Sequence, residues 1–162
     1  SDVTKRVSGS ARPVRDSCGV SRVDTFLDIQ RVGRMVTRHL DNRLRCVAMT
    51  SGQYQALAAL DVADPPVMGA VAMSLGMDRT TLTANLKPME RWGMVSVIAD
   101  ENDGRARRLH LTESGRETLA KARPIWMQAE AEIIAGFGSR NADDLRVTLA
   151  ALVEALNNSA KP

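Results

Sequence analysis

The chain is poor in cysteine and in aromatic residues. Its 2 cysteines, Cys18 and Cys46, are too few for a disulfide framework. Aromatic residues make up 3% of the 162 residues and apolar residues 44%, so leucine, valine, alanine and methionine must fill the core. No apolar run approaches the roughly 20 residues of a membrane-spanning helix, and the polar N-terminus does not resemble a secretory signal. We therefore expect a cytoplasmic protein with reduced thiols.

Most of the chain also lacks an excess of charge of one sign. The net charge is +3, but five of the 22 basic and two of the 19 acidic residues lie within residues 1–22, which leaves 17 of each elsewhere. Any basic surface in the body of the protein must therefore come from local clustering. We interpret residues 1–22, rich in Ser, Arg and Gly, as a flexible basic arm. It is either a plain disordered tail or an arm that contacts DNA phosphates.

Apolar periodicity predicts the order helix-helix-helix-helix-strand-strand-helix-helix. The predicted helices span residues 23–48, 50–64, 67–75, 79–92, 113–136 and 141–158, and the predicted strands span residues 95–99 and 108–111. Thr50 or Ser51, Asp78 and Thr112 are expected to cap the helices that follow them, because their side-chain oxygens accept hydrogen bonds from free backbone N–H groups. Pro65 is expected to stop the second helix.

This order predicts a mainly α fold with a small two- or three-stranded β wing. Residues 50–112 would form a winged helix-turn-helix DNA-binding domain, and residues 23–49 and 113–158 a helical dimerisation region. The last predicted helix has an apolar stripe that includes Leu145, Leu149 and Leu156 but has no remaining partner within one chain. Because soluble monomers rarely expose large apolar patches, we expect a homodimer.

The predicted helix over residues 79–92 has two different faces. Leu82, Leu86 and Met89 form an apolar stripe, whereas short polar and basic side chains lie on the other side. A helix that enters the major groove of DNA needs this division, although many ordinary surface helices also show it. The predicted DNA contacts on this helix are Arg79, Thr80, Thr81, Thr83, Asn85, Lys87 and Arg91.

A polar hairpin loop follows at residues 100–107 and contains Asp103, Arg105 and Arg107. A basic hairpin directly after a helix-turn-helix is typical of a wing, and arginine suits the negative potential of a narrow minor groove. We predict that these three residues contact DNA, with Asp103 orienting Arg105. The loop's acidic residues also fit an ordinary solvated hairpin.

Two runs resemble the MarR (multiple antibiotic resistance regulator) family. They are Leu75-Gly76-Met77-Asp78-Arg79-Thr80-Thr81-Leu82-Thr83, continued by Leu86-Lys87-Pro88-Met89-Glu90-Arg91-Trp92-Gly93-Met94-Val95, and Asp103-x-Arg105 followed by Leu109-x-Leu111-Thr112-x-x-Gly115-Arg116. The resemblance implies an obligate dimer on a palindromic double-stranded DNA operator, acting as a ligand-responsive repressor or, less often, an activator. Ala70 and Ala84 depart from the family pattern, which usually has polar or charged residues there, so Ala84 should lack a polar DNA contact.

The resemblance also implies a small-molecule effector, usually an aromatic or acyl anion. Arg34 and Arg38 lie four residues apart on one predicted helix face, and with His39 and Tyr54 they form our candidate ligand site. Alternatively, these arginines pair with Asp28 and Asp41 on the surface. A second hypothesis is a redox-sensing regulator of the same fold that uses Cys18 or Cys46. Some members of the family sense oxidants through a cysteine near the start of the first helix.

Other classes of protein fit less well. The sequence has no glycine-rich phosphate loop, nucleophile elbow or paired-carboxylate motif, so we expect no enzyme activity and no cofactor. The two histidines and two cysteines show no metal-ligand spacing, so we expect no metal site. The remaining competitor is a winged-helix interaction module that does not bind DNA. Salt-dependent DNA binding would discriminate between the two.

Overall fold

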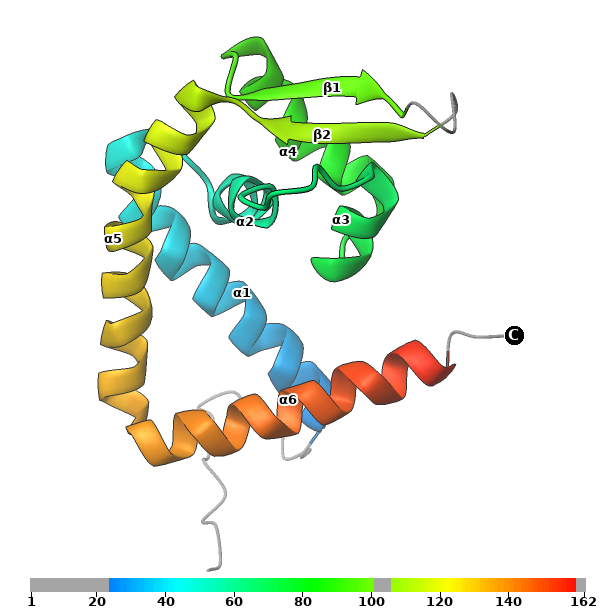
Figure 1. Ribbon diagram of the computed structural model, residues 1–162. Helices are drawn as coiled ribbons and strands as arrows, with labels where there is room; N and C mark the ends of the chain where they lie inside the picture. The colour runs from blue at the N-terminus through cyan, green and yellow to red at the C-terminus, as the bar shows by residue number, and fades with distance from the viewer. Residues whose placement is uncertain (1–23, 101–105, 160–162) are drawn as a thin grey trace, which may run out of the picture.

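The computed structural model describes residues 24–100 and 106–159 (Figure 1). In chain order the elements are α1 (Thr25–Leu44), the short 3-10 helix η1 (Arg45–Val47), α2 (Ser51–Ala59), α3 (Met68–Ser74), α4 (Arg79–Arg91), β1 (Val95–Ala99), β2 (Arg107–Leu111), α5 (Glu113–Phe137) and α6 (Ser139–Ser159). The predicted order and the mainly helical fold with a β wing are confirmed. The predicted arm at residues 1–22 lies outside the described residues.

Three long helices form one part of the molecule, and the short helices with the hairpin form the other. Figure 1 shows α1, α5 and α6 outlining an open triangle below α2, α3, α4 and the sheet. α5 extends from the sheet to the start of α6 and so connects the two parts. No residue of α6 is buried, although its sequence contains an apolar stripe. None of the described helices is long and apolar enough to cross a membrane.

The core lies where α2, α4 and the sheet meet the first half of α5. Leu57, Leu82 and Leu109 are fully buried in one cluster, and Leu119 of α5 closes it. Tyr54 of α2 stacks on Trp126 of α5, with ring centroids 4.3 Å apart and an angle of 13° between the planes. Two of the few aromatic side chains thus form a contact between α2 and α5.

The caps follow local sequence chemistry as predicted. The Thr50 hydroxyl accepts from the backbone N–H of Gln53, whose side chain accepts in return from the N–H of Thr50. Asp78 caps α4 and Thr112 caps α5. The connections after α3 and α4 contain Gly76 (φ 61°) and Gly93 (φ 69°), in the left-handed region that glycine adopts without strain.

The second helix is shorter than predicted: it ends at Ala59, whereas the sequence predicted an end near Asp64. Two later residues, Pro66 and Val67, bond to the sheet. Leu109 N–H donates to the carbonyl of Pro66 at 3.0 Å, and Val67 forms a single antiparallel bridge with Arg108. The two prolines therefore lie beside the sheet and do not mark the end of the helix. The wing consists of β1 and β2 plus this one bridge.

The start of α5 is fastened tightly to the connection between α4 and β1. Thr112 N–H donates to the carbonyl of Met94 at 3.0 Å, and the Thr112 hydroxyl donates to the carbonyl of Gly93 at 2.6 Å. A Cβ atom added to Gly115 would lie 2.2 Å from the Met94 carbonyl oxygen and 2.6 Å from a Leu111 methyl carbon. Glycine is required at position 115 because backbone occupies that space.

We predict that Gly115→Ala lowers the free energy of unfolding by about 1–3 kcal/mol, the usual cost of overpacking. Gly136→Ala is the matched control in the same helix, because a Cβ atom there would meet nothing within 4 Å. The control should be neutral or should stabilise by up to about 1 kcal/mol. Urea denaturation of both variants measures the difference. Equal midpoints would show that the α5 start is not packed as described.

Candidate nucleic-acid interface

The start of α4 is fixed by Asp78. Its carboxylate accepts from the backbone N–H of Thr81 at 2.7 Å and from the Thr81 hydroxyl at 3.1 Å. These hydrogen bonds favour the ionised carboxylate and lower the pKa of Asp78. The Thr81 hydroxyl, one of the predicted DNA contacts, is therefore used in the cap of its own helix.

The inner and outer faces of α4 divide as the sequence predicts. Leu82, Leu86 and Met89 are at most 2% exposed and belong to the core. On the outer side, a shallow hollow of about 370 Å³ brings together four of the predicted DNA contacts around one residue that was not among them. The hollow is lined by Arg79, Thr80, Thr83, Ala84 and Lys87.

Arg79 also touches the preceding helix. A Cβ atom added to Gly69 in the first turn of α3 would lie 3.2 Å from a terminal guanidinium nitrogen of Arg79. Arg79 therefore lies across α3, and the absence of a side chain at position 69 leaves room for it. Gly69 was not among the predicted site residues, since nothing local distinguishes it.

Asn85 lies on a different side of α4. It is half-buried, and a Cβ atom added to Gly52 of α2 would lie 3.0 Å from its amide atoms. Its amide nitrogen is 3.8 Å from the sulfur of Met77. The structure thus places Asn85 between α2 and α4 and away from the outer hollow. Arg91 is exposed in the last turn of α4 and does not line the hollow.

The hairpin after α4 has the register expected of a wing. Val95 pairs with Leu111 at its base and Ala99 with Arg107 near its tip, and Asp100 N–H donates to the carbonyl of Ala106 at 3.1 Å. Arg107 is exposed at this end of the hairpin. The predicted contacts Asp103 and Arg105 lie outside the described residues.

Arg108 anchors the wing near the tip end of its two strands, a role that sequence reasoning missed. Its guanidinium donates to the carboxylate of Asp100, to the carboxylate of Asp64 at 3.3 Å and to the carbonyl of Pro65 at 2.7 Å. Asp100 is buried, which makes this a charge-assisted contact of low solvent exposure. Arg108 therefore links both strands of the hairpin to the segment between α2 and α3. Pairing of Ile98 with Arg108 makes Asp100 its diagonal neighbour, a signal available from the hairpin register.

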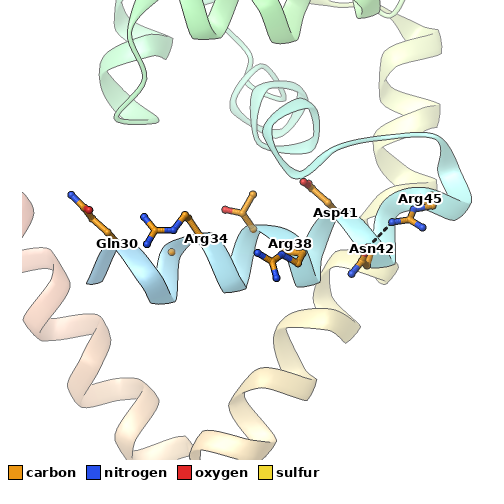
Figure 2. Close-up of a pocket in the computed structure, with 8 residues that line it drawn as sticks. Gln30, Arg34, Arg38, Asp41, Asn42 and Arg45 are labelled. Carbon is orange, nitrogen blue, oxygen red and sulfur yellow. Dashed lines mark hydrogen bonds between the residues drawn. The ribbon is translucent and has the colours of Figure 1, made fainter. Parts of the chain in front are cut away.

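The candidate ligand residues separate into two places. Arg34 and Arg38 lie on neighbouring turns of α1 and line an open groove of about 770 Å³ (Figure 2). The other lining residues are Gln30, Gly33, Thr37, Asp41, Asn42 and Arg45.

Within residues 24–100 and 106–159, neither Arg34 nor Arg38 forms an ion pair. The alternative pairing with Asp28 and Asp41 is therefore not seen among these residues, and the Asp41 carboxylate accepts from the backbone N–H of Ser51 at 2.6 Å.

His39 and Tyr54 contact α5 instead of this groove. Nε2 of His39 lies 3.4 Å from the carboxylate of Glu132, which also accepts from the guanidinium of Arg43. The Arg43 hydrogen bond lowers the pKa of Glu132. Tyr54 is buried against Trp126, and burial raises the pKa of its hydroxyl. The structure therefore brings together two of the four predicted ligand residues.

A helix-turn-helix (α3 and α4) followed directly by a two-stranded hairpin defines a winged helix-turn-helix protein. The model of the MarR family matches residues 49–106. The transcriptional activatory protein BadR of Rhodopseudomonas palustris is 29% identical over 137 residues, which cover 82% of this chain and 77% of BadR.

Solved structures agree with this assignment. The M. tuberculosis transcriptional regulator MosR, in complex with DNA, is 33% identical with a TM-score of 0.73, over 83% of this chain and 97% of MosR. The transcriptional repressor CouR, bound to a DNA duplex, is 27% identical with a TM-score of 0.70, over 77% of this chain and 89% of CouR. CouR from Rhodococcus jostii RHA1 bound to p-coumaroyl-CoA has the same fold at 23% identity and a TM-score of 0.70, over 81% of this chain and 92% of that one. The chain belongs to the MarR family of transcriptional regulators.

Proposed function

We propose that this protein is a homodimeric, sequence-specific DNA-binding regulator whose α4 helix enters the major groove. The observation that supports this most directly is the outer hollow of α4, where Arg79, Thr80 and Lys87 surround a surface open to solvent. MosR and CouR, both more than 25% identical, have been solved with DNA. Residues 50–112 form the DNA-binding unit in this proposal.

In this proposal α4 and the hairpin make different kinds of contact with DNA. The base edges in the major groove present a distinct donor and acceptor pattern for each base pair, so exposed Thr80 and Lys87 on α4 supply sequence preference. In this proposal the hairpin contacts a different groove from the one that α4 enters. Arg105, from its place in the sequence, and Arg107 contact the neighbouring minor groove and the phosphates.

A dimer is supported by the apolar side chains that the single chain leaves uncovered on α1 and α6. Phe26 is 66% exposed on α1, and Val153 and Leu156 are 56% and 60% exposed on α6. A stable monomer would present a large apolar patch to water. A second copy covers this surface by burying residues 23–49 and 113–158 against their equivalents, and a two-fold axis then places two α4 helices on a palindrome.

The finer proposal is a repressor that an aromatic or acyl anion releases from DNA. Arg34, Arg38 and Arg45 line one groove, and its Asp41 is hydrogen-bonded to the first residue of α2. An anion bound in this groove would contact α1, which is hydrogen-bonded to α2 of the winged part. A ligand that favours a different spacing of the two α4 helices lowers DNA affinity, and DNA lowers ligand affinity by the same factor.

The redox hypothesis has less support. Cys46 is exposed, and its thiol donates to the carbonyl of Arg43 at 3.2 Å; Cys18 lies outside the described residues. The interaction-module hypothesis predicts scattered basic residues on the winged part, whereas Arg79 and Lys87 line the same hollow.

The first prediction from the proposed function concerns the dimer. Leu149→Glu with Val153→Glu places two charges in the exposed apolar stripe of α6 and should produce monomers in sedimentation velocity at micromolar concentration, since unpaired charges cannot be buried. Ala151→Glu is the control, because it lies on the opposite side of the helix and is exposed. A stable monomer of the unmodified protein would refute the dimer.

The second prediction separates the roles of helix and wing. Thr80→Ala should change which operator bases matter, at a cost of about 1–3 kcal/mol for a lost base contact. Arg105→Ala should weaken binding to all sequences and reduce the salt slope by about one unit. Arg140→Ala on α6 removes the same charge far from the winged part and serves as the control. Titrations of operator variants across a salt series measure all three, and an unchanged slope for Arg105→Ala would refute the wing contact.

The third prediction tests the effector groove with p-coumaroyl-CoA, coenzyme A and p-coumarate as probes. At least one of these three anions should dissociate the unmodified protein from its operator. Arg34→Ala with Arg38→Ala should weaken that response at least tenfold while leaving DNA affinity within about twofold, because it removes on the order of 1.5–3 kcal/mol of charge-assisted hydrogen bonding. Arg31→Ala, on the same helix outside the groove lining, is the control.

The same measurement tests the competing hypothesis. A protein with Cys18→Ser and Cys46→Ser should respond to the anion as the unmodified protein does. Loss of the response in this variant would instead support regulation through a thiol.

A further inference from the structure

The centre of the outer hollow of α4 is apolar. Ala84 is exposed and lies between Thr80, one turn before it, and Lys87, almost one turn after it. Its methyl group has neither a donor nor an acceptor. The polar and basic side chains of the hollow therefore surround a small surface that cannot form a hydrogen bond with a base.

The neighbouring Thr83 extends this surface. Its hydroxyl donates to the backbone carbonyl of Arg79 at 2.7 Å, and the sulfur of Met68, at 4.0 Å, is a weaker alternative acceptor. A hydroxyl has one proton to donate, so in either case that proton is used within the protein. Thr83 therefore lines the hollow beside Ala84 without a free donor, and its side chain also carries a methyl group.

We infer that Ala84 and the Thr83 methyl group recognise the C5-methyl group of a thymine in each half-site. This inference rests on the proposed function, because it requires α4 in the major groove. Thymine alone among the four bases presents a methyl group there, and small apolar side chains are its usual partners. The other bases place polar edges at that depth, and burying those without a partner is unfavourable. Ala84 thus determines specificity through shape and apolar contact.

The test uses a duplex that the unmodified, full-length protein selects from a random DNA pool. Each thymine of the half-site is then replaced by deoxyuridine, symmetrically in both halves. This replacement removes the methyl group and keeps every hydrogen-bonding group. At one thymine position, the replacement should lower the affinity for the duplex by about fourfold per half-site, which is the loss expected for one buried methyl group. Deoxyuridine at the other positions should have little effect.

Substitution at position 84 then identifies the protein partner. Ala84→Gly should reduce the deoxyuridine penalty at that position to less than about twofold, because only the Thr83 methyl group then remains. Ala84→Ser should show a similar reduction, because a hydroxyl replaces part of the apolar surface, and serine has better helix propensity than glycine. Ala151→Gly, the same substitution at an exposed position of α6, is the matched control and should keep the full deoxyuridine penalty. Thermal unfolding of each variant establishes that it is folded before binding is measured.

The possible failures are distinct. If the unmodified protein selects no duplex and shows no salt-dependent DNA binding, the proposed function fails, and this inference fails with it. If it binds its duplex but no deoxyuridine replacement lowers affinity, or if Ala84→Gly keeps the penalty, the inference is wrong while the proposed function stands.

Discussion

Burial of the inner face of α4 is the interaction on which the proposed DNA surface depends. Leu82, Leu86 and Met89 are enclosed by the core that α2, the sheet and α5 build together. Because these three side chains fix the rotation of the helix about its axis, the residues on its other side must face outward. Packing density leaves little freedom for that rotation to change. A polar surface of defined geometry therefore results from an apolar constraint.

The wing depends on a polar constraint of a different kind. Arg108 holds the end of β1 and the segment after α2 through Asp100, Asp64 and Pro65. A two-stranded hairpin is only marginally stable alone. The Arg108 contacts and the bridge at Val67 attach the hairpin to the helix-turn-helix, so the helix and the wing approach a duplex as one unit.

The long helices have the opposite property, because the single chain leaves them incomplete. α6 has no buried residue, and α1 exposes a series of apolar side chains. In the proposed dimer, the same helices provide the apolar contact between copies and the groove that contains Arg34 and Arg38. A ligand on α1 would then act on the spacing of the two winged parts, since α1 is hydrogen-bonded to α2 through Asp41.

The sequence by itself determined the features that depend on neighbours a few residues apart. Asp78 and Thr112 cap the predicted helices, Gly76 and Gly93 follow the helix ends, and the apolar period of α4 identified its inner face correctly. Each of these depends on hydrogen bonds or spacings within about one helical turn. They were sufficient to predict the winged helix-turn-helix and four residues of its outer hollow, Arg79, Thr80, Thr83 and Lys87.

Only the tertiary structure decided what distant segments do to one another. Pro66 and Val67 bond to β2, Asn85 faces α2, and Tyr54 stacks on Trp126. None of these contacts has a local signature, because each partner lies far away in the chain and is chosen by how the helices pack. The candidate ligand residues separated for this reason: helical spacing placed Arg34 and Arg38 together, whereas packing against α5 determined the surroundings of Tyr54.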